Sequence, residues 1–564
     1  MTIGVVHSET TRQALLDNAL RSGETYGSRF LEPDERWVVG HAAYLAPAGA
    51  ESVLRRLGLP SRRLSDADLE RRAFDGLAGI LLADATSLPQ AAIDGVATAL
   101  DAGMWVLSCG PTCLPPEIVG ATRAPRSGSD PRYVALDDPS GLPIPCPERA
   151  WVPVDPMTEV VGTGRPLGSE GASRPVALVR GRCVTIATAL FSFVGEVQQG
   201  HADAASLHAH LGVRALTYLD EVAAFVERLL ERTVGPLGPR VTAWGDADAA
   251  IVLRHDTDDS DDPTFLDVER ERGVPATYAV LQDDHWRSWL RRLESADLEI
   301  EAALHYRTNR TDRLTHLFAR GEWRPDRGAI AGDGIVRQMD KARRAGLVAR
   351  TLHRHGKFFY YPETIDALDR AAQAFDGLLG SGSLFRFDAV RYAEDRRFAT
   401  RDVVRHPHTP VPLWTLFRPQ LATTRRHRPV GLWEGTHLLE PEPAVVDTLV
   451  EHARRLPGGL YTLGFHPAHA RRDSFRPGGT LAWLEHALSR TAEAGWRPQT
   501  YAAACERLSG WEALELRLAA DGHDLRNTSS HPVRGIGIRH GGARWTVELI
   551  GPGEAVRLVP PGPG

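Results

Sequence analysis

A short apolar run that ends in a cluster of acidic residues is the feature that most constrains this fold. Residues 249–253, Ala-Ala-Ile-Val-Leu, have the length and composition of a buried strand, and Arg-His-Asp-Thr-Asp-Asp follows at 254–259. A strand that ends in carboxylates presents them at its C-terminal end, where α/β barrels and open parallel sheets build their sites. An acidic loop that caps the next helix is the alternative. What the other strand ends carry decides between these interpretations.

Later strand-like runs in the same half of the chain end in histidines. Because the sequence has 22 histidines, any one of them at a strand end is weak evidence, and their common placement is stronger. Together the four strand ends supply Asp-x-Asp, His, His-x-His and His-Pro. The segments and their histidines are residues 298–304 with His305, residues 350–371 with His353 and His355 before a turn and helix, and residues 460–465 with His466.

Length and composition limit the classes of protein. A chain of 564 residues is too long to fold around a single hydrophobic core, so we expect two or three domains. The net charge of −6 gives no reason to expect nucleic-acid binding, and no apolar run approaches the ~20 residues of a membrane span. The N-terminal residues lack the pattern of a secretory signal, and the five cysteines form no Cys-x-x-Cys pair, so we expect a cytoplasmic location. A homo-oligomer is compatible with the sequence.

The first part of the chain, residues 1–237, alternates apolar runs with amphipathic stretches. Strands are expected at 37–43, 79–84 and 104–107, and apolar residues at helical spacing predict a helix over 87–101. A strand, a helix and a second strand in this order form a βαβ unit. Residues 74–110 and 176–200 resemble the class I glutamine amidotransferase-like domain, which implies a flavodoxin-like sheet.

Cys109 lies near the place of the cysteine nucleophile in active members of that family. Pro111 would break the helix that should follow the nucleophile, and no His-x-Glu follows downstream. We therefore expect a non-catalytic domain, with thiol chemistry at Cys109 as the alternative that a reactive, accessible thiol would support.

A Pro/Gly-rich junction at 234–239 indicates a domain boundary. We expect a second α/β domain over 238–508. Over 509–564, short alternating runs between Gly and Asn turns predict a small antiparallel β module.

Within the second domain, Arg-His-Asp-Thr-Asp at 254–258 and Gly-Val-Pro-Ala-Thr-Tyr-Ala-Val-Leu at 273–281 carry a resemblance. With the histidines that follow in order, they look like the NodB-homology polysaccharide deacetylases, in the more distant variant with an Arg-His-Asp-x-Asp motif. These are metal-dependent amide hydrolases on a distorted (β/α)7 barrel. The resemblance therefore implies such a barrel, a divalent metal and an N-acylated carbohydrate or small-molecule substrate.

The resemblance also implies roles for individual residues. Asp256 matches the catalytic base and Asp258 the carboxylate ligand of the metal. His305 matches the first histidine of the family's His-x-x-x-His metal motif, and His466 matches the late histidine that acts as general acid. This chain departs from the family at Asn309, where the second metal-binding histidine of that motif should stand.

The third ligand must then come from elsewhere, and His355 or His353 is the candidate. We expect His355, because Gly356 allows the chain to turn away from the metal directly after it. Two imidazoles and a carboxylate favour Zn²⁺ over Mg²⁺ or Ca²⁺. The function expected is hydrolysis of an N-acetyl or related amide, and the alternative is a catalytically silent glycan-binding or scaffold protein.

Overall fold

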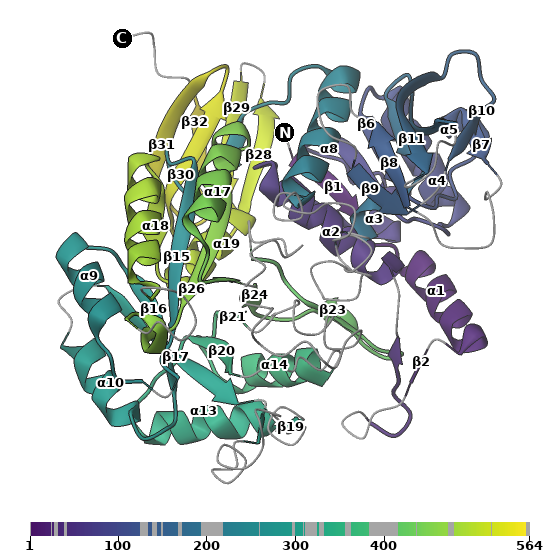
Figure 1. Ribbon diagram of the computed structural model, residues 1–564. Helices are drawn as coiled ribbons and strands as arrows, with labels where there is room; N and C mark the ends of the chain where they lie inside the picture. The colour runs from purple at the N-terminus through teal and green to yellow at the C-terminus, as the bar shows by residue number, and fades with distance from the viewer. Residues whose placement is uncertain are drawn as a thin grey trace.

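The computed structural model (Figure 1) describes most of the chain. The described residues are 2–559 without 24, 27–31, 39–41, 125–132, 138–143, 148–149, 167–171, 193, 195–217, 259, 296–298, 308, 311–323, 326–331, 356–362, 383–415, 436, 472–478 and 520–521. The described part is a mixed α/β structure with two large sheets that lie side by side.

The first sheet belongs to the N-terminal part of the chain and has nine strands. Its order is β4 (Ser61–Leu64), β1 (Thr2–Val6), β5 (Leu77–Ala83), β6 (Trp105–Cys109), β13 (Cys183–Ile186), β12 (Arg174–Arg180), β11 (Glu159–Pro166), β8 (Tyr133–Asp137) and β9 (Ile144–Pro147). The first five strands pair in parallel, in the order typical of flavodoxin-like sheets. The last four extend the sheet through antiparallel pairs, which the sequence patterns did not predict.

The helices of this part are α1 (Glu9–Ser22), α2 (Ala42–Arg56), α3 (Asp66–Glu70), α4 (Gln90–Asp101), α5 (Pro116–Val119) and α8 (Tyr218–Val234). The helix expected over 87–101 is α4, and the strands expected at 79–84 and 104–107 are β5 and β6. The strand expected at 37–43 is present at its start as β3 (Trp37–Val38), which pairs with β2 (Thr25–Tyr26). Residues 39–41 lie outside the described residues, and the expectation is wrong at 42–43, because Ala42 already belongs to α2, whose buried side joins the core.

The second sheet is parallel throughout and curls into a half-barrel. Its order is β24 (Trp433–Glu434), β21 (Gly380–Gly382), β20 (Thr351–His355), β17 (Ile300–Arg307), β16 (Ala276–Leu281), β15 (Ala249–Asp256), β26 (Gly459–Phe465) and β25 (Leu438–Leu439), while β27 (Arg497–Gln499) also pairs with β15. Within the described residues no ladder joins the end strands β24 and β25, so the closed barrel implied by the resemblance is seen only as this curled sheet.

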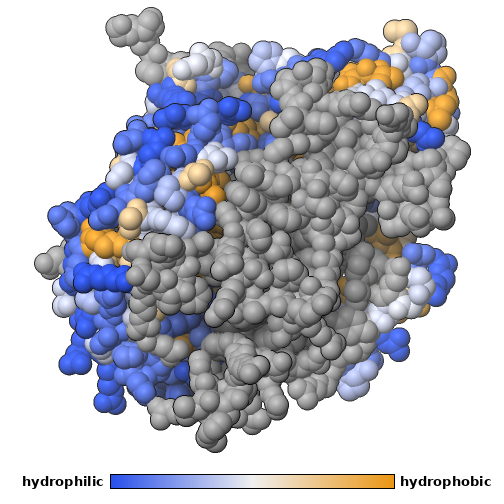
Figure 2. Space-filling model, viewed as in Figure 1, coloured by the Kyte–Doolittle hydropathy of each residue, from blue (hydrophilic) through white to orange (hydrophobic). Residues whose placement is uncertain are grey.

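Helices alternate with these strands, as parallel connections require. They are α9 (Thr264–Arg272), α10 (Trp286–Glu294), α13 (Gly334–Arg344), α14 (Glu363–Ala374), α17 (Pro443–Arg455) and α18 (Leu481–Glu493). Figure 2 shows mainly hydrophilic side chains on the side where α9 and α10 lie in Figure 1, as expected for helices that cover a sheet with one face. No helix in the described ranges is long and apolar enough to cross a membrane.

The C-terminal strands form two small antiparallel sheets beyond α19 (Tyr501–Glu512). One contains β28 (Leu514–Ala519), β29 (Gly522–Asn527) and β32 (Ala555–Leu558); the other contains β30 (Val533–His540), β31 (Ala543–Ile550) and β14 (Arg240–Thr242). The tail is therefore antiparallel β structure, as predicted, and it recruits one strand from the start of the second α/β region. The division into 1–237, 238–508 and 509–564 stays a prediction.

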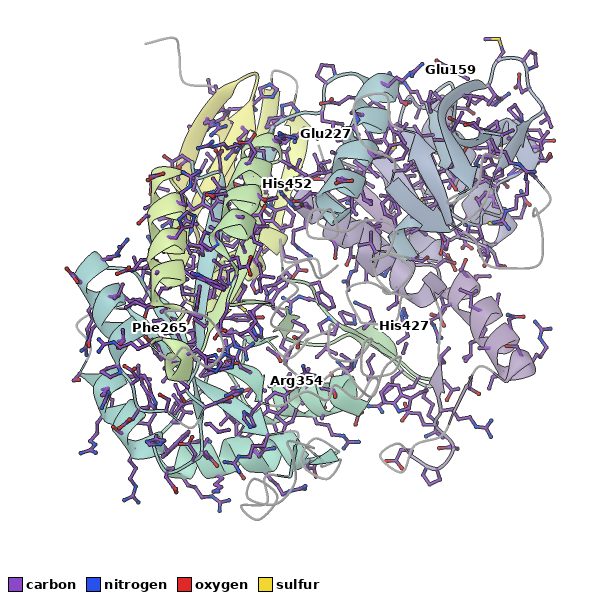
Figure 3. All side chains as sticks on the ribbon, viewed as in Figure 1. Glu159, Glu227, Phe265, Arg354, His427 and His452 are labelled. Atoms are coloured by element: carbon purple, nitrogen blue, oxygen red, sulfur yellow. The ribbon has the colours of Figure 1, made fainter. Side chains whose placement is uncertain are left out.

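Buried and half-buried contacts join the two parts of the chain that contain the large sheets. The hairpin of β22 (Gln420–Ala422) and β23 (His427–Pro429) reaches the N-terminal part, where Arg426 donates to both carboxylate oxygens of Glu35. Asp220 on α8 pairs with His452 on α17, and Figure 3 shows His452 on the side of the second sheet that faces α8. These contacts join sequence segments more than 200 residues apart into one assembly.

Candidate metal centre

The three residues predicted to bind metal lie together at the carboxyl ends of three strands of the second sheet. Asp258 follows β15, His305 lies near the end of β17, and His355 ends β20. The Nδ1 atoms of His305 and His355 lie 2.8 and 3.0 Å from the two carboxylate oxygens of Asp258. One ligand atom from each residue lies within 4.8 Å of the other two, and the two imidazole rings are edge to face, with centroids 4.9 Å apart.

The environment of these residues fits a divalent cation. Both imidazoles are buried, and Nε2 of His305 has no hydrogen-bond partner among the described residues. Burial opposes the ionisation of Asp258, but the charges and hydrogen bonds of His305 and His355 hold its pKa well below the usual value. A carboxylate with two imidazoles is a donor set that Zn²⁺ accepts, and it leaves a coordination position open. Their role as ligands stays a prediction.

His353, the alternative third ligand, lies elsewhere. It precedes His355 by two residues on the same strand and is completely buried, with Nε2 3.3 Å from the hydroxyl of Thr351 and its ring edge-on to Tyr501. Burial lowers its pKa well below the usual value, so it is neutral. His353 therefore packs in the interior, and His355 is the one that meets Asp258. Gly356, on which the choice between them rested, lies outside the described residues.

Asp256 is the last residue of β15, so the strand runs three residues further than the apolar run indicates. Strand alternation puts Arg254 on the same face, where its Nε and Nη2 each donate to one oxygen of Asp256 at 2.8 Å. Burial raises the pKa of Asp256, but the charges of Arg254 and His305 outweigh this effect and lower the pKa to about 2. Asp256 is thus an ionised carboxylate with a fixed orientation.

Arg254 is a site residue to which the sequence reasoning assigned no role. It is buried, and besides Asp256 it donates to the carbonyl oxygen of Gly382 at 2.9 Å. Its Nη1 also lies 2.7 Å from Nδ1 of His437, which was not predicted. His255, between the two site residues, points to the opposite face and meets buried Glu269 at 2.5 Å. The Arg-His-Asp motif therefore combines two site residues with one residue of the packing behind the sheet.

His466 follows β26 and belongs to a second cluster. Its Nδ1 lies 3.3 Å from Oε1 of Glu440, and Nδ1 of His469 lies 2.6 Å from the same oxygen. Burial alone would lower the pKa of His466, but the hydrogen bond and charge of Glu440, helped by Asp256 and Asp258, raise it to about 9. His466 is therefore protonated at neutral pH, and its charge interacts with the carboxylates of the first cluster.

Glu440 and His469 were missed by the sequence reasoning. His469 had a usable signal, since it follows His466 by three residues at the same strand end. Glu440 was not singled out by any sequence pattern, and its backbone adopts φ +44°, which non-glycine residues rarely do. Such conformations occur where the surrounding structure forces them, often at functional sites.

Two other predicted features are placed as follows. Asn309 belongs to the short strand β18 (Asn309–Arg310), and its side chain lies outside the described residues. Cys109, at the end of β6, is completely buried and donates its thiol to the carbonyl oxygen of Thr188 at 3.4 Å. A buried thiol satisfied in this way is not placed for nucleophilic attack, which favours the non-catalytic interpretation of the N-terminal domain.

Comparison with known proteins yields structural likenesses at low similarity. No protein-family model and no curated protein matches the sequence. The solved structures with similar regions include α-L-fucosidase isoenzyme 2 from Paenibacillus thiaminolyticus (15% identity, 35% of this chain, 31% of that chain, TM-score 0.26). They also include a putative polysaccharide deacetylase from Mycobacterium smegmatis (15% identity, 49% of this chain, 94% of that chain, TM-score 0.29). A third is a glutamine amidotransferase from Thermotoga maritima (10% identity, 41% of this chain, 98% of that chain, TM-score 0.25). Because these TM-scores are low, the likenesses carry no argument about function.

Proposed function

We propose that this protein is a metal-dependent hydrolase that removes an N-acetyl or related amide group from a carbohydrate or another small N-acylated substrate. The observation that carries the proposal is the position of Asp258, His305 and His355 beside an ionised Asp256 and a protonated His466. Amide hydrolysis needs an activated water and a proton donor for the leaving nitrogen, and these residues match both needs.

Asp258, His305 and His355 would hold the metal, most suitably Zn²⁺. Bound there, it would lower the pKa of water toward ~7 and polarise the amide carbonyl. Asp256 would accept the proton of the attacking water. Its two hydrogen bonds to Arg254 stop the carboxylate from rotating and keep it ionised, which prepares it for that transfer.

His466 would donate a proton to the departing amine. Because Nδ1 of this ring faces Glu440, Nε2 is the nitrogen that can meet a substrate. Glu440 keeps the imidazole in its charged form and fixes the ring orientation, as the carboxylate partner of a catalytic histidine does. His469, on the same oxygen, helps to hold Glu440 in place.

The pH dependence of activity should report this pair. An acid with a pKa of about 9 is protonated at pH 7 and loses its proton as the pH rises, so activity should fall on the alkaline side near pH 9. Glu440→Gln removes the charge that raises the pKa of His466, so the alkaline limb should move toward the usual value of about 6.5. A pH–rate profile for hydrolysis measures the shift. An unchanged limb would mean that His466 is not the acid.

The proposal itself is tested with the zinc-loaded full chain and a panel of N-acetylated mono- and oligosaccharides, with acetate release as the readout. Turnover that disappears in Asp256→Asn, while zinc content stays the same, would support the assignment. If some sugars of the panel bind saturably but no acetate is released from any of them at any zinc loading, the protein is a glycan-binding protein and the hydrolase proposal is wrong. Asn309, in place of a histidine in the family's motif, is the feature that favours that second function.

A further inference from the structure

A cavity of about 380 Å³ lies where the N-terminal part, the second α/β region and the C-terminal strands meet. The N-terminal part contributes Arg55 from α2 and Arg63 from β4. Arg418, before β22, comes from the second region, and Glu512 ends α19 next to the C-terminal strands. This cavity lies apart from the candidate metal centre, since the two share no lining residue.

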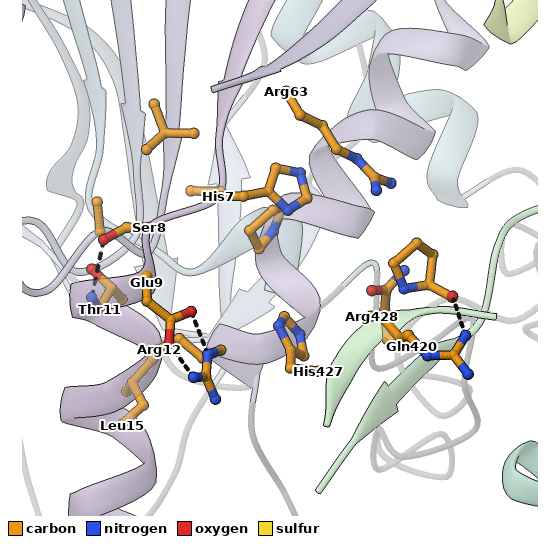
Figure 4. Close-up of a pocket in the computed structure, with 15 residues that line it drawn as sticks. His7, Ser8, Glu9, Thr11, Arg12, Leu15, Arg63, Gln420, His427 and Arg428 are labelled. Carbon is orange, nitrogen blue, oxygen red and sulfur yellow. Dashed lines mark hydrogen bonds and ion pairs between the residues drawn. The ribbon is translucent and has the colours of Figure 1, made fainter. Parts of the chain in front are cut away.

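A second cavity of about 280 Å³ adjoins the first, with Arg63 and Pro429 lining both. Figure 4 shows its walls, with Arg12 and Arg63 on the N-terminal side and Arg428 on the hairpin. Each of these arginines has a close carboxylate partner: Glu9 for Arg12, Glu51 at 2.7 Å for Arg63, and Asp369 at 2.7 Å for Arg428. The positive charge around this cavity is therefore compensated within the protein.

The first cavity differs, because the described residues that line it include three arginines and two carboxylates. Arg63 donates to both oxygens of Glu51, at 2.7 and 2.9 Å. Arg418 forms an ion pair with Glu512, with its Nε and Nη2 at 3.0 and 2.9 Å from the same carboxylate oxygen. Arg55 is left with one long contact of 3.4 Å to the other oxygen of Glu512.

The guanidinium of Arg55 is buried as well as poorly paired. Its side chain is 7% exposed, and Nε has no hydrogen-bond partner in the part of the chain that the structure describes. The carbon of the guanidinium lies 4.7 Å from the ring centre of Trp433 and 6.0 Å from that of Trp511, so cation–π attraction offsets part of the cost of burial. Burial lowers the pKa of Arg55; the charges of Glu512 and Glu51 offset this only in part, and those of Arg418 and Arg63 lower it further.

We propose that the cavity binds a compact oxyanion, the phosphate or carboxylate group of a small molecule, against Arg55. A buried cation without a full partner is costly, and a guanidinium matches such anions through paired donors. The volume is more than ten times the ~30 Å³ of a single water, so the cavity also admits part of the molecule that carries the anionic group. Because the lining comes from three parts of the chain, the ligand would stabilise their association.

The test is isothermal titration of the full chain with inorganic phosphate and with citrate, against sodium chloride at matched ionic strength. We expect saturable binding at one site per chain and a rise in Tm with ligand concentration. Tighter binding of phosphate would identify a phosphorylated ligand, and tighter binding of citrate a carboxylate. Absence of saturable binding of either anion would overturn the proposal, whatever the outcome of the acetate-release test.

Two substitutions of opposite sign test the role of Arg55. Arg55→Gln should weaken binding by about tenfold or more, because a charge-assisted hydrogen bond is lost. Glu512→Gln removes the carboxylate that competes for Arg55 and should tighten binding, so this variant remains informative if Arg55→Gln fails to fold. Arg71→Gln, on an exposed arginine of the same N-terminal part, is the matched control and should bind like the wild type. Equal affinities in all four proteins would refute the site.

Discussion

Replacement of Arg56 by alanine should lower the free energy of unfolding by about 3–5 kcal/mol. Arg56, at the end of α2, is 1% exposed and pairs through Nε with Asp220 at 2.5 Å. Its Nη2 and Nη1 donate to the carbonyl oxygens of Leu456 and Pro457 at 2.7 and 2.9 Å, across the contact between the two large sheets. Among the described residues, the variant leaves the buried carboxylate of Asp220 with His452 as its charged partner, and it removes the donor of one buried and one half-buried carbonyl.

Urea unfolding followed by both fluorescence and circular dichroism measures this loss and shows whether the two sheets still unfold together. The matched control is Arg71→Ala, which removes an ion pair of 2.9 Å to Asp68 in which Arg71 is 70% exposed. Exposed pairs contribute at most about 1 kcal/mol, so this variant should be nearly as stable as the wild type. If the two variants lose the same free energy of unfolding, the buried interactions of Arg56 stabilise the protein no more than an exposed ion pair does.

Asp258→Asn, His305→Ala and His355→Ala should each abolish stoichiometric zinc binding. Removal of residues that only orient ligands lowers metal affinity by about 10–100-fold, and loss of a ligand itself should exceed this. Equilibrium dialysis followed by elemental analysis gives zinc per chain, with one ion expected for the wild type.

His353→Ala is the matched control for these variants. It removes a buried imidazole from the same strand, two residues from His355, that does not face Asp258. We expect it to keep one zinc ion per chain. Loss of zinc in His353→Ala with retention in His355→Ala would reverse the choice of third ligand, and full zinc content in Asp258→Asn would reject the site.

The sequence predicted much of the second sheet, because its strands correspond to short runs of apolar residues. The apolar runs at 249–253 and 460–465 correspond to β15 and β26, and the residues at their ends lie at the same edge of the sheet. It placed Asp258 and His305 in one group through the family resemblance and added His355 from its position at a strand end before Gly356; parallel strands bring such ends together.

What the sequence could not supply depends on contacts between distant segments. The antiparallel half of the first sheet and the pairing of β14 with β30 follow from partner choice, for which local patterns contain no signal. The same holds for the Arg254–His437 contact, between residues 183 positions apart, and for the three-way cavity around Arg55.

The sequence by itself therefore determined which residues end strands and which chemical groups those ends offer. Only the tertiary structure decided how those groups are oriented and charged. Glu440 illustrates the reason: its unusual backbone conformation and its place 26 residues from His466 are stable only when both strands are packed, and this packing raises the pKa of the histidine. Local propensity selects the elements, whereas burial and distant charges set the electrostatics of the site.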